Sequence, residues 1–524
     1  MSYIKETIAR LGDLKDGEMK EINVRDTNIL LAYVDGKYYA TQAHCSHYGA
    51  SLAKGSLCGT RVICPWHHAC FDVTTGRHLE APGLDSLPTY EVSIEGDEVV
   101  VSIPENAPTT VYPPMVDHIT SDQHAIIIGG GAAGVQAAQA LREADYQGAI
   151  TIITSESAGP YDRTALSKKF LQDGASDDDL PLRPTSFYQE YNIQLLSGRK
   201  VIRLDADNKT VRLDNDQVVE YDKAIVCTGS QPKQLPVPGA DFPNVYPLRS
   251  LQDGKQLKKA AQQAEKVVII GASFIGMECA ASLQKLGCSV TVISPDQYPF
   301  ASKWGERIGK MIKALHESEG VTFYGKSRVE RIEGDSQART VVLDTGETLS
   351  ADLILVGIGV QPITDFIDGL NVAEDGGISV DSYLHAGKDV YAAGDIARFE
   401  YQGQPVRIEH WRLASQQGKA AGLAVAGKAQ AFDKVPFFWT AQQGKNIRYV
   451  GFVKEYDDIL YQGEVESQDF IALYAKDGKI RAALGMNRDK DIAAIEHLMQ
   501  LNKMPAPSVV QDNAFDWQGA LTSE

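Results

Sequence analysis

Four residues in two short motifs near the start of the chain have the types and spacing that hold iron and sulfur. The motifs are Cys45-Ser46-His47 and Cys64-Pro65-Trp66-His67. Each offers one thiolate and one imidazole, so two sulfurs can bind one iron of a [2Fe-2S] cluster and two ring nitrogens the other. A zinc finger uses the same residue types but usually places a Cys pair before a His pair. Zinc, or four simply buried side chains, are the weaker alternatives.

The sequence around these ligands resembles that of Rieske domains, with Cys-Ser-His-Tyr-Gly at 45–49 and Cys-Pro-Trp-His-His-Ala-Cys-Phe-Asp at 64–72. In respiratory Rieske proteins a disulfide joins the ligand loops and hydroxyl groups donate to the sulfurs. By this resemblance those positions hold Ala50, Trp66, Ala69 and Phe71 here. Because fewer donors stabilise the reduced cluster less, we expect a potential toward the low end of the roughly −150 to +300 mV range.

Other Cys and His residues lie close to the motifs without belonging to them. We interpret Cys58 and Cys70 as packed free thiols, and His44 and His68 as neighbouring or surface groups rather than ligands. We expect the two ligand imidazoles to be exposed and to form the edge through which electrons leave the cluster.

Length and composition exclude several classes of protein. The chain has 524 residues, enough for three or four domains, and a net charge of −18 that argues against nucleic acid and anionic membranes as partners. Seven cysteines, two of them assigned to iron, suit a reducing cytoplasm. Residues 1–20 contain no apolar run typical of a signal peptide, and no apolar stretch reaches membrane-spanning length. We therefore expect a cytoplasmic protein, and a homo-oligomer is possible.

Residue patterns divide the chain into an N-terminal β-rich part and a larger part in which strands alternate with helices. Short apolar runs such as 29–34 and 99–103, each next to a Gly-containing turn, predict an all-β domain over residues 1–103. The Pro-rich residues 104–123 have the composition of a semi-extended tether.

One nucleotide-binding fingerprint then occurs twice. An apolar strand runs into Gly129-Gly130-Gly131-Ala132-Ala133-Gly134, and a second strand runs into Gly271-Ala272-Ser273-Phe274-Ile275-Gly276, with Ser273 at the middle glycine. The glycines permit the tight turn, the approach of a pyrophosphate and the packing of helix on strand. Glu156 follows the next strand of the first copy and is placed to accept from a ribose hydroxyl. Ser294 and Asp296 stand there in the second copy, which leaves NADH or NADPH open with a slight preference for NADH.

From residue 124 to about 520 the chain resembles FAD-dependent pyridine-nucleotide oxidoreductases, above all oxygenase-coupled ferredoxin reductases and apoptosis-inducing-factor-like proteins. The segments behind this resemblance, in family order, are Pro160-Tyr161-Asp162-Arg163 with Leu166-Ser167-Lys168, Cys227-Thr228-Gly229-Ser230, Val356-Gly357-Ile358-Gly359-Val360-Gln361-Pro362, Ala393-Gly394-Asp395, Glu409-His410-Trp411 and Val435-Pro436-Phe437-Phe438-Trp439.

The resemblance implies a set of cofactor-binding residues. For FAD they are Gly129, Gly131, Ala133, Gly134, Glu156, Arg163, Val201, Lys233 and Asp395; for NAD(P)H they are Gly271, Ile275, Gly276, Glu278 and Gly359. Lys168 is expected to pair with Glu278 beside the flavin and to raise its electron affinity as a catalytic pair. Spacing alone would make both ordinary surface charges.

The segment Glu409-His410-Trp411 is expected to open a helix directed at the flavin, which the helix dipole would favour in its anionic reduced form. Trp439 is also expected near the flavin. The alternative for Trp411 and Trp439 is a role as plain core aromatics.

An absence of cysteine decides the expected reaction. Disulfide reductases and related peroxidases of this fold carry a redox Cys on the helix that follows the first nucleotide-binding strands, but no Cys occurs between Cys70 and Cys227. Electrons must therefore pass from NAD(P)H through FAD to the cluster and on to a redox protein or oxygenase. A redox-sensing protein of the apoptosis-inducing-factor type, or a module that has lost its cofactors, are the alternatives.

The predicted fold is multidomain. It comprises an all-β Rieske domain (1–103), a linker (104–123), a Rossmann-like FAD-binding domain in two parts (124–240 and 371–432), a Rossmann-like NAD(P)H-binding domain (241–370) and a small α+β C-terminal domain (433–524).

Overall fold

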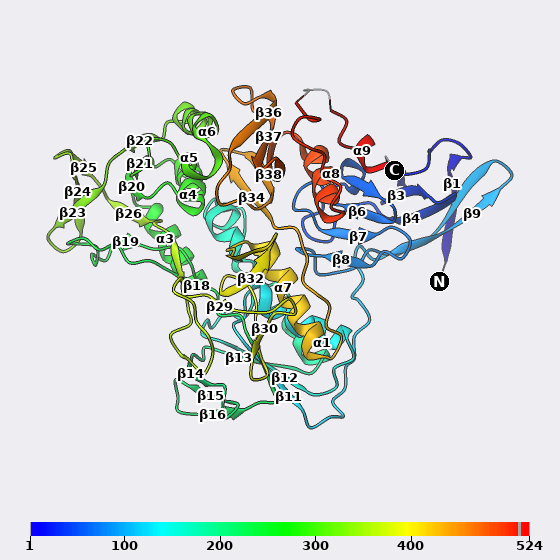
Figure 1. Cartoon of the computed structure of the whole chain (residues 1–524), viewed down its shortest axis with the longest axis horizontal. Helices are drawn as coiled ribbons and strands as arrows, with labels where there is room; N and C mark the ends of the chain where they lie inside the picture. Colours follow the sequence, from blue (N-terminus) through cyan, green and yellow to red (C-terminus); the bar gives the residue numbers. More distant parts are fainter. Residues whose placement is uncertain (1, 512–514, 523–524) are drawn as a thin grey trace.

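Two antiparallel sheets form the N-terminal part of the chain (Figure 1, blue). The computed structural model describes residues 2–511 and 515–522. The strands are β1 (Tyr3–Arg10), β2 (Glu18–Val24), β3 (Thr27–Val34), β4 (Lys37–Gln42), β5 (Ser56–Cys58), β6 (Arg61–Ile63), β7 (Cys70–Asp72), β8 (His78–Glu80), β9 (Thr89–Glu95) and β10 (Glu98–Pro104), with a 3-10 turn η1 (Leu52–Lys54). One sheet has the order β1-β10-β9-β4-β3-β2, and the other has the order β5-β6-β7-β8.

Strand β3 shows how this domain is built around its metal-binding loops. Successive side chains of a strand point to opposite faces. Leu30 and Ala32 accordingly pack in the core that also contains Cys45 and Cys64, whereas Leu31 packs in a separate core on the other face. The cysteines of both motifs are therefore fixed on one side of a buried strand.

The first nucleotide-binding domain is a doubly wound sheet in the order β13-β12-β11-β17-β31-β30. All neighbours in it are parallel except β30 and β31. Its elements and their attachments are β11 (His124–Ile128), α1 (Ala132–Glu143), β12 (Ala149–Thr154), η2 (Arg163–Ala165), η3 (Leu166–Phe170), η4 (Asp177–Asp179), α2 (Thr185–Glu190), β13 (Ile193–Ser197), β14 (Val201–Asp205), β15 (Thr210–Leu213), β16 (Val218–Glu220), β17 (Lys223–Val226), β18 (Ser230–Pro232), β27 (Val360–Pro362), β28 (Ile367–Asp368), β29 (Ile378–Ser379), β30 (His385–Gly387), β31 (Val390–Ala392), β32 (Ala397–Tyr401), β33 (Gln404–Arg407) and α7 (Trp411–Val425).

Helices α1 and α7 of this domain pack closely because α7 carries glycine at the contact. A Cβ atom added to Gly418 would lie 2.0 Å from the carbonyl oxygen of Ala133, and one added to Gly422 would lie 2.5 Å from that of Ala137. Such separations are possible only without a side chain. The packing fixes the beginning of α7, at Trp411, beside the first fingerprint.

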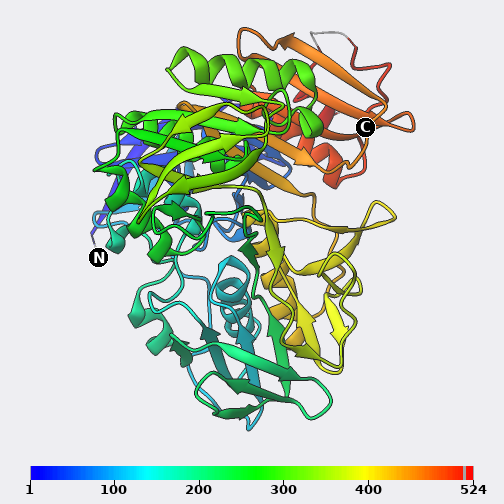
Figure 2. The same ribbon diagram turned by 90° about the vertical axis from the view of Figure 1, so that its left-hand side faces the viewer.

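The second nucleotide-binding domain repeats this architecture with a parallel sheet in the order β19-β26-β20-β21-β22. Its elements are β19 (Val245–Tyr246), α3 (Leu251–Ala261), β20 (Lys266–Ile270), α4 (Phe274–Lys285), β21 (Ser289–Ser294), α5 (Ala301–Trp304), α6 (Glu306–Ser318), β22 (Thr322–Gly325), β23 (Val329–Gly334), β24 (Ala338–Leu343), β25 (Thr348–Ser350) and β26 (Leu353–Val356). Figure 2 shows this green domain above the cyan sheet of the first.

An antiparallel sheet in the order β34-β35-β38-β37-β36 forms the C-terminal domain. The elements are β34 (Phe437–Gln442), β35 (Lys445–Gly451), β36 (Asp458–Glu464), β37 (Asp469–Lys476), β38 (Lys479–Met486), α8 (Asp489–Gln500) and α9 (Gly519–Thr522). Helix α8 lies between this sheet and the N-terminal domain (Figure 1), where Ala493 packs with Ile63 and Cys70.

The segment that joins the N-terminal domain to the first fingerprint is held along the protein surface rather than being a free tether. Val111 forms a backbone bridge with Ser86, Val116 N donates to Arg142 O at 3.2 Å, and Thr120 N donates to Gln147 O at 3.0 Å. Its composition indicated an extended conformation but not these contacts. In the described ranges 2–511 and 515–522, no helix combines the length and the apolar character needed to cross a membrane.

Candidate functional site

The two metal-binding motifs form loops with the same backbone hydrogen bonds. Cys45 N donates to Ala50 O at 2.9 Å and Gly49 N to Cys45 O at 2.9 Å. In the second loop Cys64 N donates to Ala69 O at 2.8 Å and His68 N to Cys64 O at 3.1 Å. Gly49 and His68 occupy the same place in their loops, and both have positive φ, +73° and +58°. The two loops thus share one backbone frame around their Cys, but His47 is the second residue after Cys45 and His67 is the third after Cys64.

The ligand side chains meet as two pairs. The Cys45 and Cys64 side chains are 3% and 1% exposed, and the nearby Cys64 thiol together with burial raises the pKa of the Cys45 thiol. The Nδ1 atoms of His47 and His67 lie 3.1 Å apart. Burial lowers the pKa of His47 to about 4 and that of His67 well below its usual value, so both rings are neutral and can offer a lone pair to iron. Among the described residues, no three or more His, Cys, Asp or Glu side chains converge on one ion. Two separate pairs fit a two-iron cluster better than zinc.

The surroundings of the sulfurs are poor in donors. All seven cysteines are free thiols, so no disulfide joins the loops. Ala50, Ala69 and Phe71 are buried and carry no hydroxyl group, and the Ser46 hydroxyl donates to Asp85 O at 2.8 Å. The expected low potential stays a prediction that these surroundings support.

One expectation about the cluster is wrong. The imidazole ligands are half-buried, and they do not form an open edge. The His67 ring lies 4.6 Å from the Trp439 ring of strand β34, between centroids, and the His47 ring lies 6.4 Å from it. The domain docks with this edge inward because both loops also contact the rest of the chain, as when the Tyr48 hydroxyl donates to Asp162.

A cleft of about 620 Å³ runs between the two nucleotide-binding domains, and Trp439 lines it as well. Fourteen of the residues expected to bind cofactor also line it: Gly129, Gly131, Ala133, Glu156, Arg163, Lys168, Val201, Ile275, Glu278, Gly359, Asp395, Glu409, Trp411 and Trp439. The expected residues Gly134, Lys233, Gly271, Gly276 and His410 are not part of its lining. Lys233 is exposed, and its backbone N donates to Gly359 O at 3.0 Å.

The glycines of the first fingerprint have different physical roles. Gly129 has φ +117°, and a Cβ there would lie 2.2 Å from Cys227 O. A Cβ on Gly134 would lie 2.0 Å from Gly129 O, so this glycine packs the helix on the strand without facing the cleft. A Cβ on Gly131 would meet nothing within 4 Å. Gly131 therefore leaves open the space at the start of α1 where a pyrophosphate can approach the backbone amides.

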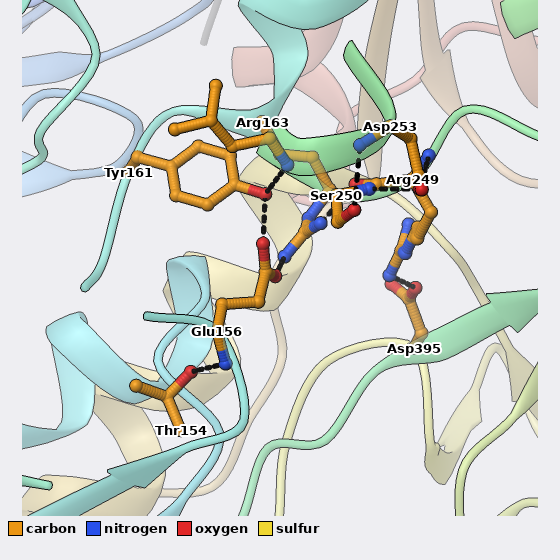
Figure 3. Close-up of polar contacts among 9 residues, drawn as sticks. Thr154, Glu156, Tyr161, Arg163, Arg249, Ser250, Asp253 and Asp395 are labelled. Carbon is orange, nitrogen blue, oxygen red and sulfur yellow. Dashed lines mark hydrogen bonds and ion pairs between the residues drawn. The ribbon is translucent and has the colours of Figure 1, made fainter. Parts of the chain in front are cut away.

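Glu156 and Arg163 belong to a polar network at one end of the cleft (Figure 3). The Glu156 carboxylate accepts from Tyr161 Oη at 2.6 Å and from Arg163 Nη2 at 2.5 Å. Burial by itself would raise the pKa of Glu156, but the Arg163 guanidinium and the Tyr161 hydroxyl outweigh it and lower the pKa. Glu156 is thus an anion at neutral pH and an acceptor for a ribose hydroxyl.

The network also contains a residue that the sequence did not indicate. Arg249 Nη2 lies 3.1 Å from Asp395 Oδ2, and both side chains line the cleft (Figure 3). Arg249 and Arg163 bring two guanidinium groups to one end of the cleft, and their positive charges would suit the two negative charges of a pyrophosphate. In the sequence, Arg249 stands out only as the residue before Ser250, the N-cap of helix α3, and this signal is too weak to predict a role in the cleft.

Lys168 and Glu278 form the expected ion pair, with Lys168 Nζ 2.8 Å from Glu278 Oε2. Glu278 is 6% exposed and also accepts from Ser167 Oγ at 2.5 Å and Thr440 Oγ1 at 2.8 Å. Lys168 projects from the π-helical turn η3, where its backbone departs from helical geometry. These are therefore not surface charges.

The second fingerprint turns at Gly271, which has φ +105°. Ser273, at the position of the middle glycine, caps helix α4 by accepting from Gly276 N at 3.2 Å. Ser294 accepts from Asp296 N at 3.1 Å, so its hydroxyl is engaged within the chain. Ile275, Glu278 and Gly359 face the cleft, and the choice between NADH and NADPH stays a prediction.

The expected helix at Glu409-His410-Trp411 is present, since α7 begins at Trp411 with His410 as its N-cap. Burial lowers the pKa of His410 to about 3, and its ring contacts Phe438 at 4.9 Å between centroids. Trp411 and Trp439 both line the cleft, which plain core aromatics would not do.

Two nucleotide-binding folds share one cleft, the chain has no cysteine between Cys70 and Cys227 where disulfide reductases of this fold carry their redox thiol, and a Cys2His2 site lies at the rim of the cleft. Together these features define a class of enzyme. It is the FAD-dependent NAD(P)H oxidoreductase of the ferredoxin reductase type, here with a Rieske [2Fe-2S] domain. Family models agree: "Pyridine nucleotide-disulphide oxidoreductase" matches residues 123–418, "Rieske [2Fe-2S] domain" matches 5–91 and "Reductase C-terminal" matches 437–521. The chain belongs to the pyridine nucleotide-disulphide oxidoreductase family, with FAD and a [2Fe-2S] cluster as cofactors and a pyridine nucleotide as substrate.

Individual relatives cover the chain in two ways. Apoptosis-inducing factor 3 of Mus musculus is 33% identical over 95% of this chain and 84% of its own length. Rhodocoxin reductase of Rhodococcus erythropolis is 30% identical over 76% of this chain and 94% of its own. The crystal structure of the covalent putidaredoxin reductase–putidaredoxin complex superimposes with a TM-score of 0.73 at 26% identity, covering 77% of this chain and 99% of that one.

Proposed function

We propose that this enzyme passes electrons from NAD(P)H through FAD to its own Rieske cluster, and from the cluster to an external acceptor such as a terminal oxygenase. The contact between His67 and Trp439 carries this proposal. Trp439 lines the cleft that both fingerprints form, so one side chain reaches from a cluster ligand to the flavin-binding space. Bound FAD would accept a hydride from the nicotinamide and release electrons singly.

The residues of the cleft have distinct tasks in this scheme. Arg163, Arg249 and Asp395 line the cleft, where the two arginines would supply positive charge for the pyrophosphate of FAD and Asp395 would accept a hydrogen bond from its ribityl chain. Lys168, held by Glu278, places a cation beside the flavin, where it stabilises the negative charge of the reduced form. Phe438 and Trp439 exclude water from the side that faces the cluster.

Electrons need a way out other than the imidazole edge, because that edge faces Trp439. Two rings that contact the ligand histidines reach solvent: Tyr48, 36% exposed and 4.1 Å from the His47 ring, and Trp66, 43% exposed and 6.4 Å from the His67 ring. We propose that the acceptor approaches them. The redox protein in the putidaredoxin reductase complex supports an acceptor that is itself a protein.

An anaerobic titration of the whole chain with NADH, and separately with NADPH, tests this function. Absorption reports the flavin and EPR reports the cluster. We expect the preferred nucleotide to bleach the flavin and then to produce the EPR signal of a reduced Rieske cluster. A flavin that is reduced while the cluster remains oxidised would contradict the proposal.

A second candidate function is redox sensing, in which binding of NADH changes the shape of the protein or its association with partners. The match over 95% of the chain to a protein named Apoptosis-inducing factor 3 favours it. This candidate expects a long-lived complex between the nucleotide and the reduced flavin, with an idle cluster. The same titration therefore separates the two.

A further inference from the structure

A residue of the C-terminal domain forms a hydrogen bond with the loop that carries Cys64 and His67. Arg448 Nε donates to the carbonyl oxygen of Trp66 at 3.0 Å, and the Arg448 guanidinium also pairs with Asp489. Arg448 is 3% exposed. The peptide group that it holds is the one that leads into His67, so the backbone of the ligand loop is fixed from outside its own domain.

His68, the residue after the ligand His67, is held through its side chain. His68 Nδ1 forms a hydrogen bond with the Glu496 carboxylate, and its ring stacks on Phe437 with 3.9 Å between centroids. Glu496 Oε1 lies 2.7 Å from Arg412 Nη2, and Arg412 Nε donates to Ala81 O at 2.8 Å. Arg412 thereby connects the beginning of α7 to the N-terminal domain at two places.

Burial makes this arrangement costly unless every charge is paired. Arg412 is 1% exposed, His68 is 0% exposed and Glu496 is 6% exposed. Two buried charges contribute little net stability compared with apolar residues of the same size. What such a network does provide is geometry, because each hydrogen bond has a defined direction.

The geometry that is fixed is the contact between the cluster loop and strand β34. Phe437, under His68, and Trp439, against His67, are alternate residues of that strand and face the same side. Arg412 directly follows Trp411, which lines the cleft. A shift of the loop would therefore change the separation of His67 from Trp439 without altering the ligands or the flavin site.

We propose that Arg412 and Arg448 are positioning residues that hold the Cys64–His67 loop against Trp439 and so set the rate at which the cluster is reduced from the flavin. The inference rests on the proposed function. Neither arginine lines the cleft or belongs to the ligand set. Electron transfer slows as the distance between donor and acceptor grows, so loss of either hydrogen-bonded hold on the loop should be visible in this step.

The test uses the full-length holoprotein in anaerobic stopped-flow with NADH. The variants are Arg448→Met, Arg412→Met and their conservative counterparts Arg448→Lys and Arg412→Lys. Glu496→Gln removes the charge that links His68 to Arg412 with little change in side-chain shape. It keeps the inference testable if Arg412→Met does not fold. Lys434→Met is the matched control, since Lys434 Nζ lies 3.0 Å from Glu80 Oε1 across the same pair of domains but contacts neither ligand loop.

We expect cluster reduction to be several-fold slower in the Met and Gln variants, and partly restored in the Lys variants. Flavin bleaching, FAD and iron content and the EPR spectrum should match wild type, as should every property of Lys434→Met. An unchanged rate of cluster reduction overturns the inference, and so does an equal loss in Lys434→Met. A wild-type cluster that stays oxidised overturns the proposed function instead, which distinguishes the two failures.

Discussion

The buried carboxylate of Glu278 in the cleft accepts hydrogen bonds from three side chains. It accepts from Ser167, Lys168 and Thr440, which come from the π-helical turn η3 and from strand β34. A buried carboxylate with this many donors is compensated for its loss of hydration. Glu278 therefore holds Lys168 in one position, and Lys168 places a fixed positive charge where the flavin is expected.

Removing that charge should make the flavin harder to reduce. We predict that Lys168→Met lowers the potential of the bound FAD by about 30 mV, which is about 1.4 kcal/mol for a two-electron couple. Lys169→Met is the control, because the Lys169 ammonium lies over the Tyr48 ring and not along the cleft. Anaerobic potentiometry measures both, and equal potentials for wild type and Lys168→Met would contradict the assignment.

The imidazole ligands make a second prediction at this scale. His67→Ala should abolish the visible and EPR features of the cluster and lower iron content, since one iron loses a ligand, while the flavin spectrum persists. His44→Ala should change neither, because His44 pairs with Glu21 at 3.1 Å on the surface. Iron analysis and spectra after oxygen-free preparation decide it. Retention of a normal cluster in His67→Ala would rule out His67 as a ligand.

At the scale of elements, two glycines at the turn between β11 and α1 have different roles, one in cofactor binding and one in folding. We predict that Gly131→Ala folds normally but loses FAD affinity, because its methyl group enters open space that the pyrophosphate needs. Gly134→Ala should instead destabilise the protein, because its methyl group would lie 2.0 Å from Gly129 O. The ratio of FAD to protein and the melting temperature report the two effects. Full FAD content with normal affinity in Gly131→Ala would contradict the first prediction.

Local sequence patterns predicted the strands, turns and helices that carry the site, and the family resemblance predicted the ion pair between Lys168 and Glu278. The two fingerprints predicted the turns that precede α1 and α4, and the segment Glu409-His410-Trp411 predicted the beginning of α7. Spacing alone could not pair Lys168 with Glu278, because the two meet only after the domains pack. For the same reason the sequence did not single out Arg412 and Arg448, each of which is buried and donates to a carbonyl oxygen of the N-terminal domain. Lys233 was carried over from a flanking segment, and its side chain is exposed.

The arrangement of the whole molecule corrects the expected direction of the cluster. Its ligand histidines turn toward Trp439, and the linker is attached along the surface, so the N-terminal domain has one defined seat on the reductase. Both ligand loops contribute to that seat, one through Tyr48 and Asp162 and the other through Trp66 and Arg448. In the proposed scheme the imidazole edge is therefore the side that receives electrons.

An exit through exposed rings has a consequence for external acceptors. We predict that Trp66→Ala slows reduction of cytochrome c, used as an artificial one-electron acceptor, but leaves flavin-to-cluster transfer unchanged. Arg448 holds the backbone carbonyl of Trp66, and that contact survives loss of the ring. Tyr3→Ala is a control, since Tyr3 is 57% exposed and far from the ligands in sequence. Equal cytochrome c reduction by wild type and Trp66→Ala would place the exit elsewhere.

The central claim is that flavin and cluster exchange electrons within one chain. Anaerobic stopped-flow mixing with NADH over a wide range of protein concentrations measures it most directly, with the flavin followed by absorption and the cluster by rapid-freeze EPR. We predict that the cluster is reduced after the flavin, at a rate independent of protein concentration. A rate that rises in proportion to concentration, or a cluster still oxidised when the flavin is fully reduced, would contradict the account.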